Sequence, residues 1–167
     1  MQNPFLIGER IYLRPIEEAD ASNYVRWLND AEVSRYLAAS FPLNLFREQE
    51  YVRNLYTDRN GLNLALSLQD GDRHIGGAGI HDIHQTDRSA TFGIVIGEQD
   101  CWGKGYGTEA TRLLVAHGFD TLNLNRIGLN VFEFNPRGIR AYEKAGFVKE
   151  GLLRQATTRK ASTTTPY

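Results

Sequence analysis

The segment Trp102-Gly103-Lys104-Gly105-Tyr106-Gly107-Thr108-Glu109-Ala110 places three glycines at alternate positions, with a lysine between two of them. A strand-like run at residues 91–96 precedes it, and a helix-like run at residues 108–122 follows it. Because the turn carries few bulky side chains, its backbone N–H groups are exposed where the helix begins, and the positive end of the helix dipole faces the same point. The segment therefore predicts a binding site for a phosphate or a pyrophosphate.

The composition is typical of a single soluble globular domain. The chain has 167 residues, of which 41% are hydrophobic and 23% are charged. Its 19 basic and 20 acidic residues nearly cancel, which argues against nucleic acid or an anionic membrane as the main partner. The single cysteine, Cys101, excludes an internal disulfide and a multi-cysteine metal cluster, and it fits a reducing compartment. No signal pattern and no apolar run of about 18 residues is present, so we expect a cytoplasmic protein without a metal.

Strand and helix patterns follow one another in an order typical of an α+β domain. Strand-like runs cover residues 10–16, 62–68, 74–84, 90–96, 126–134 and 147–157, and helix-like runs cover residues 17–28, 47–56, 108–122 and 136–145. Asp70-Gly71 predicts a tight hairpin turn between the second and third strands. Because the sequence has no repeat and no interior linker, we expect one domain over residues 1–158 with a mainly antiparallel sheet, followed by a Thr-rich tail at residues 159–167.

Two classes of nucleotide site fit the glycine turn poorly. A nucleoside triphosphate loop requires Gly-Lys followed by Ser or Thr, whereas Lys104 precedes Gly105 and no hydroxyl follows it. A dinucleotide fingerprint has the spacing of Gly105, Gly107 and Ala110, but that motif follows its strand almost at once. Here about eight residues separate Ile96 from Gly105, and only one strand–helix–strand unit is evident. Both facts disfavour a dinucleotide.

Two segments together carry a family resemblance. Gly105 and Gly107 match a Gln/Arg-x-x-Gly-x-Gly/Ala pattern in which Trp102 replaces the first residue. About 30 residues later the chain reads Asn-Pro-Arg-Gly-Ile-Arg-Ala-Tyr-Glu-Lys-Ala-Gly-Phe over positions 135–147. Both motifs resemble those of the GNAT superfamily of acetyl-CoA-dependent N-acetyltransferases, in particular its branch of ribosomal-protein N-terminal and spermidine acetyltransferases. Residues 10–15 and 150–154 also resemble this branch, so the resemblance covers the chain to about residue 158 and implies the GNAT fold.

The resemblance implies that acetyl-CoA is the co-substrate, with its pyrophosphate on the backbone amides of the glycine turn and its pantetheine arm along the preceding strand. The residues that it assigns to this cofactor are Ile94, Val95, Ile96, Gly103, Lys104, Gly105, Tyr106, Gly107, Thr108 and Asn135. Two ordinary structural roles compete with this assignment. The strand is equally well an internal strand of the core, and Asn135 before Pro136 is also a good helix cap. Gly138 stands where the family commonly has Ser, which removes one hydroxyl partner for the cofactor.

Tyr142 is the side chain that the resemblance assigns to the chemistry, as the acid that protonates the leaving thiolate. A phenol with a pKa near 10 stays protonated until a thiolate with a conjugate pKa near 8.5 forms. The competing role for Tyr142 is core packing. The general base is open, because Thr91 stands where many relatives carry a Glu. The remaining candidates are His81, Asp82, His84 and Glu133, of which His81 and Glu133 are taken as the leading ones. We expect no catalytic role for Cys101.

The end of the sequence and the acceptor side leave further alternatives. Relatives continue into a final strand that inserts between the strands at residues 126–134 and 147–157. Here the flanking strands close up, the tail substitutes, or a second copy supplies the pairing; of these three outcomes we expect the last, a homodimer with strand exchange. The resemblance implies an acceptor that is a protein N-terminal amine, a polyamine or another small amine. Glu17, Glu18, Asp20 and Glu48 either attract a polycation or form a solvated helix face. The rival function is a non-catalytic acyl-CoA-binding regulatory module.

Overall fold

The computed structural model describes residues 1–37, 41–154 and 156 of the chain. Its six strands form one sheet in chain order: β1 (Leu6–Ile7), β2 (Ile11–Pro15), β3 (Leu62–Leu68), β4 (His74–His84), β5 (Ser89–Ile96) and β6 (Arg126–Gly128). Neighbouring strands are antiparallel up to β5, and β5 and β6 are parallel. The expected α+β class with a mainly antiparallel sheet is confirmed. The predicted tail at residues 159–167 lies outside the described residues.

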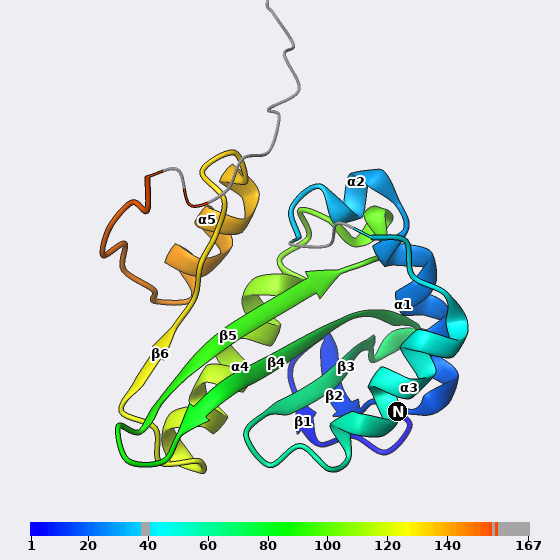
Figure 1. The fold of residues 1–167 in the computed structure, drawn as a ribbon, viewed down its shortest axis with the longest axis horizontal. Coiled ribbons are helices and arrows are strands. Elements are labelled where there is room, and N and C mark those ends of the chain that lie inside the picture. The colour runs from blue at the N-terminus through cyan, green and yellow to red at the C-terminus, as the bar shows by residue number, and fades with distance from the viewer. Residues whose placement is uncertain (38–40, 155, 157–167) are drawn as a thin grey trace, which may run out of the picture.

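Helices cover both faces of this sheet (Figure 1). One face packs against α1 (Ala21–Leu28), α2 (Ala31–Ser34) and α3 (Leu45–Leu55), and the other packs against α4 (Tyr106–Asp120). Strand alternation divides the core accordingly. Leu64 and Leu66 belong to the cluster under α4, whereas Ala65 between them packs with Tyr24 of α1 and Val52 of α3. Helix α5 (Pro136–Lys144) lies against α4.

The helix boundaries follow from local capping. The Asn44 side chain accepts a hydrogen bond from the Arg47 N–H at 2.9 Å, so α3 begins two residues earlier than the sequence pattern indicates. In α5 the Asn135 side chain caps the Gly138 N–H at 2.9 Å, with Pro136 at the first helical position. Gly146 adopts φ +103° directly after the helix, which is the left-handed ending that glycine favours.

The predicted two-residue turn at Asp70-Gly71 is wrong, although the hairpin itself is present. A short 3₁₀ segment, η2 (Asp70–Asp72), connects β3 to β4, and both Gly71 and Asp72 have positive φ angles. The Asp72 carboxylate binds the amino terminus of Met1 at 2.7 Å and accepts a hydrogen bond from the Tyr12 hydroxyl at 3.2 Å. These contacts hold Asp72 outside the ladder, so the connection is longer than a two-residue turn.

The last two predicted strands are also largely wrong in the described part of the chain. Strand β6 ends at Gly128 instead of residue 134, and residues 147–153 form no strand. A strand persists only where a neighbour completes its hydrogen-bond ladder, and no described strand lies beside residues 129–134 or 147–153. After β6 the chain runs away from β5 towards α5 (Figure 1). It returns to the start of β6 through an ion pair between Arg126 and Glu150.

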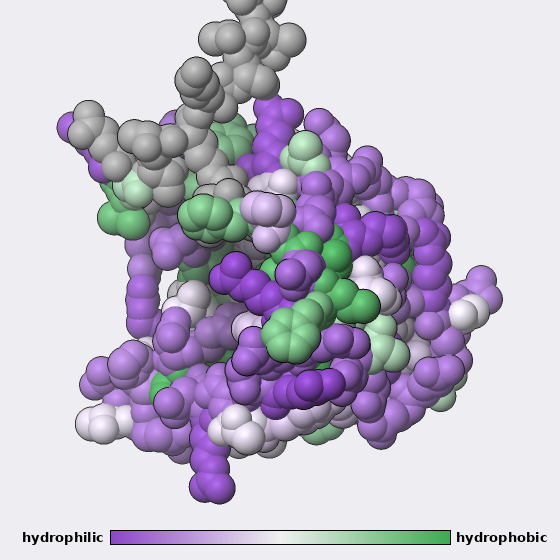
Figure 2. Space-filling view, turned by 45° about the vertical axis from the view of Figure 1, so that its right-hand side comes forward, coloured by the Kyte–Doolittle hydropathy of each residue, from purple (hydrophilic) through white to green (hydrophobic). Residues whose placement is uncertain are grey.

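The surface is mainly hydrophilic on the face shown in Figure 2, with hydrophobic residues in separate patches. Several exposed hydrophobic side chains belong to the segment after α5. Val148 is 82% exposed, Leu152 58% and Leu153 73%. No strand or helix covers them within the described residues, which is consistent with the missing ladder beside this segment.

Candidate active site

The glycine turn forms a preshaped entry to α4. Gly103 and Gly105 adopt φ +74° and +86°, values that are costly for residues with a side chain, and Gly105 occupies the N-cap position of α4. Arg10 of the β1–β2 connection holds the turn from below. Its Nη1 donates to the Lys104 carbonyl at 2.9 Å, and its Nη2 lies 2.9 Å from the Glu109 carboxylate. The turn is therefore fixed without a ligand.

The N–H groups at the start of α4 are available to an anion. In the described part of the chain, no backbone or side-chain acceptor takes a hydrogen bond from the N–H groups of residues 105–108. A helix leaves its first N–H groups without internal partners, and its dipole favours negative charge at this end. Lys104 is exposed within the same turn and adds a positive charge. The predicted pyrophosphate residues thus lie together in a geometry that fits a pyrophosphate.

One edge of β5 is open beside this turn. The ladder with β6 ends at the pair Thr91–Gly128, whereas the ladder with β4 continues through Ile94, Val95 and Ile96. At Ile96 the carbonyl already accepts a hydrogen bond from Trp102 Nε1 at 2.8 Å. The edge available to a ligand with amide groups therefore runs from residue 92 to residue 95. Of the predicted strand residues, Ile94 and Val95 belong to this stretch, and Ile96 lies at its end.

Tyr142 approaches β5 from the α4 face. Its ring packs edge-on against Phe92 at 6.2 Å and against Phe147 at 6.1 Å. Burial raises the pKa of the Tyr142 hydroxyl, so the group stays protonated at neutral pH. No hydrogen bond within the described residues occupies this hydroxyl, which leaves it free to donate to a ligand. Tyr142 therefore makes the core packing that was the competing role, and its hydroxyl remains available for chemistry.

His81 approaches β5 from the opposite face, the one covered by α1 and α3. A Cβ at Gly79 would lie 2.7 Å from His81 Cε1, and a Cβ at Gly93 would lie 3.5 Å from His81 Nε2. The imidazole therefore extends across the β4–β5 ladder over Gly93. At this residue β5 is no longer paired with β6. Burial lowers the pKa of His81, and the charges of Asp82 and Asp58 oppose this effect, so the ring is neutral near pH 7. Thr91, which replaces the family's Glu, is paired with His81.

For the other predicted candidates, no contact with Phe92 or Gly93 is found among the described residues. Glu133 is exposed in the turn before α5, and no hydrogen bond or ion pair of the described residues joins it to His81 or Tyr142. Asp82 and His84 are exposed at the end of β4, beside an irregular step in the ladder. They line a polar cavity of about 430 Å³ together with Thr91. The structure thus brings His81 and Tyr142 to the same part of β5, and no contact between described residues joins Glu133 to either of them.

Asn135 and Gly138 are coupled by packing. The Asn135 carboxamide caps α5 through Gly138, and a Cβ at Gly138 would lie 2.6 Å from Asn135 Nδ2. A Ser at this position would collide with the cap as it is arranged here. The close approach of Gly138 to the capping carboxamide is a contact that the sequence pattern alone did not reveal. Arg137, between them, lies 3.9 Å above the Trp102 ring and so joins α5 to the glycine turn.

The acidic residues expected on the acceptor side lie in three different environments. The expectation of a solvated helix face is wrong for Asp20 and Glu48, which are buried. Glu18 is at the surface and pairs with Arg53. Asp20 is 6% exposed and binds Arg14 at 2.7 and 2.8 Å. Glu48 is 5% exposed on the inward face of α3 and has no such partner within the described residues. Its spacing four residues before the buried Val52 was the sequence signal for this burial.

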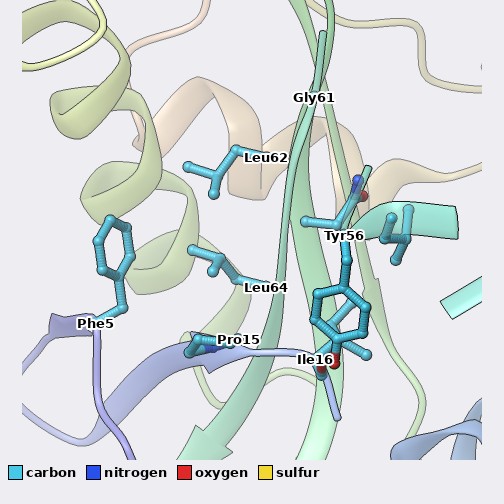
Figure 3. Close-up of a pocket in the computed structure, with 9 residues that line it drawn as sticks. Phe5, Pro15, Ile16, Tyr56, Gly61, Leu62 and Leu64 are labelled. Carbon is cyan, nitrogen blue, oxygen red and sulfur yellow. Dashed lines mark hydrogen bonds between the residues drawn. The ribbon is translucent and has the colours of Figure 1, made fainter. Parts of the chain in front are cut away.

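A separate apolar cavity opens at the start of β3 (Figure 3). It is lined by Phe5, Pro15, Ile16, Leu55, Tyr56, Gly61, Leu62, Asn63 and Leu64. The Tyr56 hydroxyl donates to the Ile16 carbonyl at 2.5 Å at its rim. Strand β4 lies between β3 and β5, so this cavity is displaced from the open edge of β5 and from the glycine turn. None of the predicted site residues lines it.

The described residues contain no group of three or more His, Cys, Asp or Glu side chains arranged to hold a metal ion. No helix formed by residues 1–37 or 41–154 is long and apolar enough to cross a membrane. Cys101 is buried, and burial raises the pKa of its thiol, which keeps it protonated.

Comparison with known proteins places this geometry in a family. Residues 10–148 match the Acetyltransferase (GNAT) domain. The chain is 32% identical over 155 residues to YoaA of Bacillus subtilis strain 168, described as an uncharacterized N-acetyltransferase, covering 91% of this chain and 87% of that protein. It is 33% identical over 144 residues to the spermidine N(1)-acetyltransferase of Escherichia coli K12, covering 86% and 75%.

The fold agrees with the sequence match. The crystal structure of spermidine N-acetyltransferase from Vibrio cholerae in complex with CoA and spermine superposes with a TM-score of 0.77, at 26% identity over 84% of this chain and 82% of that one. The expected fold and family, including the likeness to spermidine acetyltransferases, are therefore confirmed. The chain belongs to the GNAT family of acetyl-CoA-dependent N-acetyltransferases.

Proposed function

We propose that this enzyme transfers the acetyl group of acetyl-CoA directly to a primary amine at the open edge of β5. One observation carries the proposal. Tyr142 and His81 reach β5 at the neighbouring residues Phe92 and Gly93 from opposite faces of the sheet, where the ladder with β6 has ended. An amine can therefore approach a thioester from the α1–α3 face while the thiolate leaves towards α5. This arrangement supports a single direct displacement without a nucleophilic side chain.

Acetyl-CoA is positioned by backbone groups in this proposal. The free N–H groups at residues 103–108 bind the pyrophosphate, and Ile94, Val95 and Ile96 border the path of the pantetheine arm. Asn135, as the cap of α5, holds that helix against the turn and faces the cofactor arm. The preformed left-handed glycines support this role because they need no rearrangement on binding.

Two proton transfers complete the reaction. His81, neutral near pH 7, accepts the proton that the amine loses as its nitrogen bonds to the thioester carbon. As the carbon–sulfur bond breaks, Tyr142 donates its proton to the CoA thiolate and is then reprotonated from solvent. The raised pKa of Tyr142 ensures that the proton is present when the thiolate forms. Glu133 is the second candidate base.

The acceptor is a primary amine of a polyamine, a protein N-terminus or another small molecule. Relatives named spermidine N(1)-acetyltransferases support the polyamine. Steady-state CoA release with a panel of amines tests the function and narrows the acceptor at once. Saturable release that matches the formation of N-acetylated amine is expected. The rival function, a non-catalytic acyl-CoA-binding module, is favoured by Thr91 in place of a Glu, and it predicts tight CoA binding without release for any amine.

We also propose a cytoplasmic enzyme whose domain spans residues 1–158, with no nucleic acid or membrane partner, and which forms a homodimer by strand exchange. The exposed Val148, Leu152 and Leu153 beside the short β6 support the homodimer, because a second copy could bury them and complete the ladder. Size-exclusion chromatography with light scattering tests this directly. A mass of about twice 18.9 kDa is expected, and a monomer at all accessible concentrations refutes it.

A further inference from the structure

Two glycines form a shelf on the sheet beside the open edge of β5. Gly79 of β4 and Gly93 of β5 are partners in the ladder between these strands. Two residues earlier in β4 the same face is covered by α1, since a Cβ at Gly77 would lie 2.4 Å from the Tyr24 oxygen. At Gly93, by contrast, the described residues place only the His81 ring within 4 Å of such a Cβ, apart from the two adjoining residues. The Gly93 end of the shelf therefore has room for a small group beside the imidazole.

Asn63 of β3 lies beside the His81 imidazole on this shelf. Asn63 pairs with Gly79 in the β3–β4 ladder. A Cβ at Gly79 would lie 2.7 Å from Asn63 Oδ1 and 2.9 Å from His81 Nε2, so Oδ1 and Nε2 are no farther apart than these two distances together allow. A nitrogen atom that hydrogen-bonds to both atoms at about 2.9 Å each can span a separation of up to about 5.8 Å. Both side chains are partly exposed, so one amine nitrogen can contact both of them.

The surroundings of Asn63 direct its carbonyl oxygen towards His81. A Cβ at Gly61 would lie 3.6 Å from Asn63 Nδ2 and 2.8 Å from Asp58 Oδ2, so the amide nitrogen lies on the side of the carboxylate. This orientation is the favourable one, because the amide nitrogen is a donor and the carboxylate is only an acceptor. The Asp58 carboxylate, the Asn63 carboxamide and the His81 imidazole thus follow one another from the start of β3 towards the open edge of β5.

We propose that Asn63 Oδ1 accepts a hydrogen bond from the reacting amine while His81 Nε2 receives the proton that this amine loses. A neutral primary amine has two N–H groups and one lone pair. With one N–H at each side chain, rotation of the nitrogen is restricted and its lone pair is positioned for attack on the thioester carbon. As the nitrogen–carbon bond forms, one proton moves to His81, and the other stays on the amide product and bonded to Asn63.

The inference rests on the proposed function and adds a residue that selects the acceptor. A secondary amine has only one N–H group, which His81 requires. The contact with Asn63 is therefore specific to primary amines.

Steady-state acetylation of two related amines tests this contact. The wild-type enzyme is expected to prefer 1,4-diaminobutane over N,N′-dimethyl-1,4-diaminobutane, whose amines are secondary. Asn63→Leu removes the acceptor at similar side-chain volume. It should lower kcat/KM for the primary amine about 10-fold or more, because it removes a hydrogen bond to a nitrogen that becomes charged, and should affect the secondary amine much less. The Kd for CoA should not change.

Asn60→Leu, exposed in the turn before β3, is the matched control and should keep the wild-type preference. If Asn63→Leu also keeps that preference while the wild-type enzyme acetylates the diamine, the inference is wrong and the proposed function stands. If the wild-type enzyme acetylates no amine, the proposed function fails, and the amine contact of Asn63 fails with it.

Asn63→Asp separates the amine contact from a structural role. This variant keeps an acceptor oxygen in the same place, so the preference for the primary amine should persist. Its new charge beside the imidazole should raise the pKa of His81 by about 0.5 or more. An NMR titration without CoA or amine measures this pKa, and the signal of His81 among the four histidines is the one that His81→Asn lacks. An unchanged pKa of His81 overturns the proposal, and this variant decides the question if Asn63→Leu does not fold.

Discussion

Gly105→Ala is expected to weaken CoA binding as well as the fold. Gly105 caps α4 at φ +86°, and a Cβ there would lie 3.3 Å from Arg10 Nη2. The Arg10 guanidinium is itself fixed by Glu109 and by the Lys104 carbonyl, so it cannot move away freely. The alanine must therefore shift the turn that aligns the N–H groups at the start of α4.

The magnitude follows from two separate costs. A left-handed conformation costs a residue with a side chain about 1–2 kcal/mol. For a chain of this size that loss lowers the Tm by about 2–8 °C. Displacing the turn also removes at least one hydrogen bond to a charged phosphate, worth about 1.5 kcal/mol or more, so the Kd for CoA should rise about 10-fold or more.

Gly71→Ala is the matched control. Gly71 also has a positive φ, at +72°, and a Cβ there would meet nothing within 4 Å. Both variants should show a similar fall in Tm by circular dichroism, because the backbone strain is the same. Only Gly105→Ala should lose affinity for free CoA in calorimetric titration. If the two variants bind CoA equally tightly, the start of α4 is not the pyrophosphate site.

Four further outcomes are expected. Tyr142→Phe should lower kcat by about 10-fold or more with an unchanged Kd for CoA, since general acid catalysis is worth at least that factor; unchanged turnover would exclude the acid role. His81→Asn should lower kcat at pH 7 and remove a fall in rate that the wild type shows below about pH 6.5, the ordinary His range, because burial lowers the pKa of His81. Asp20→Asn should destabilise the fold by about 3 kcal/mol in denaturant titration, because it leaves Arg14 buried without its partner, whereas the exposed Glu18→Gln should change stability much less. The folded pKa of Asp20 is well below its unfolded value near 4, so its stabilising contribution should be complete above about pH 4 and be lost as the pH falls further; acid unfolding of Asp20→Asn should lack that component.

The sequence predicted the local backbone of the glycine turn and of α5 well, because short motifs encode it. The glycines at positions 103 and 105 needed left-handed angles, and Asn135 with Pro136 needed to cap a helix; both are local requirements that short motifs record. The alternation of β3 likewise fixed which side chains face α4, as Leu64 and Leu66 do.

The surroundings of Asp20 and Glu48 could not be predicted in the same way, because they depend on contacts between distant segments. Asp20 reads as a helix-start acid, yet its partner Arg14 lies in β2 and buries it. Glu48 is buried by its position on the inward face of α3, where this helix packs against α1. No short motif encodes these approaches, although the helical spacing between Glu48 and Val52 was a usable signal.

The prediction of strands beyond residue 128 was wrong for a related reason. Residues 126–134 have the alternation of a strand, and Val131 and Phe134 supply apolar side chains to it. Alternation of apolar and polar residues gives only a tendency to form a strand, however. A neighbouring strand must supply the hydrogen bonds that stabilise it. Within the described residues β5 pairs with β6 only as far as Gly128, so the pattern had no partner to complete it.

Acetyl transfer itself is the most direct test of the account. Purified enzyme is incubated with acetyl-CoA and 1,4-diaminobutane, with thiol release followed continuously and the products identified by mass spectrometry. The proposed function predicts saturable release of one CoA for each N-acetylated diamine formed, lowered in Tyr142→Phe and in His81→Asn without loss of CoA binding. Tight CoA binding with no N-acetylated product from this diamine or any other amine would contradict it.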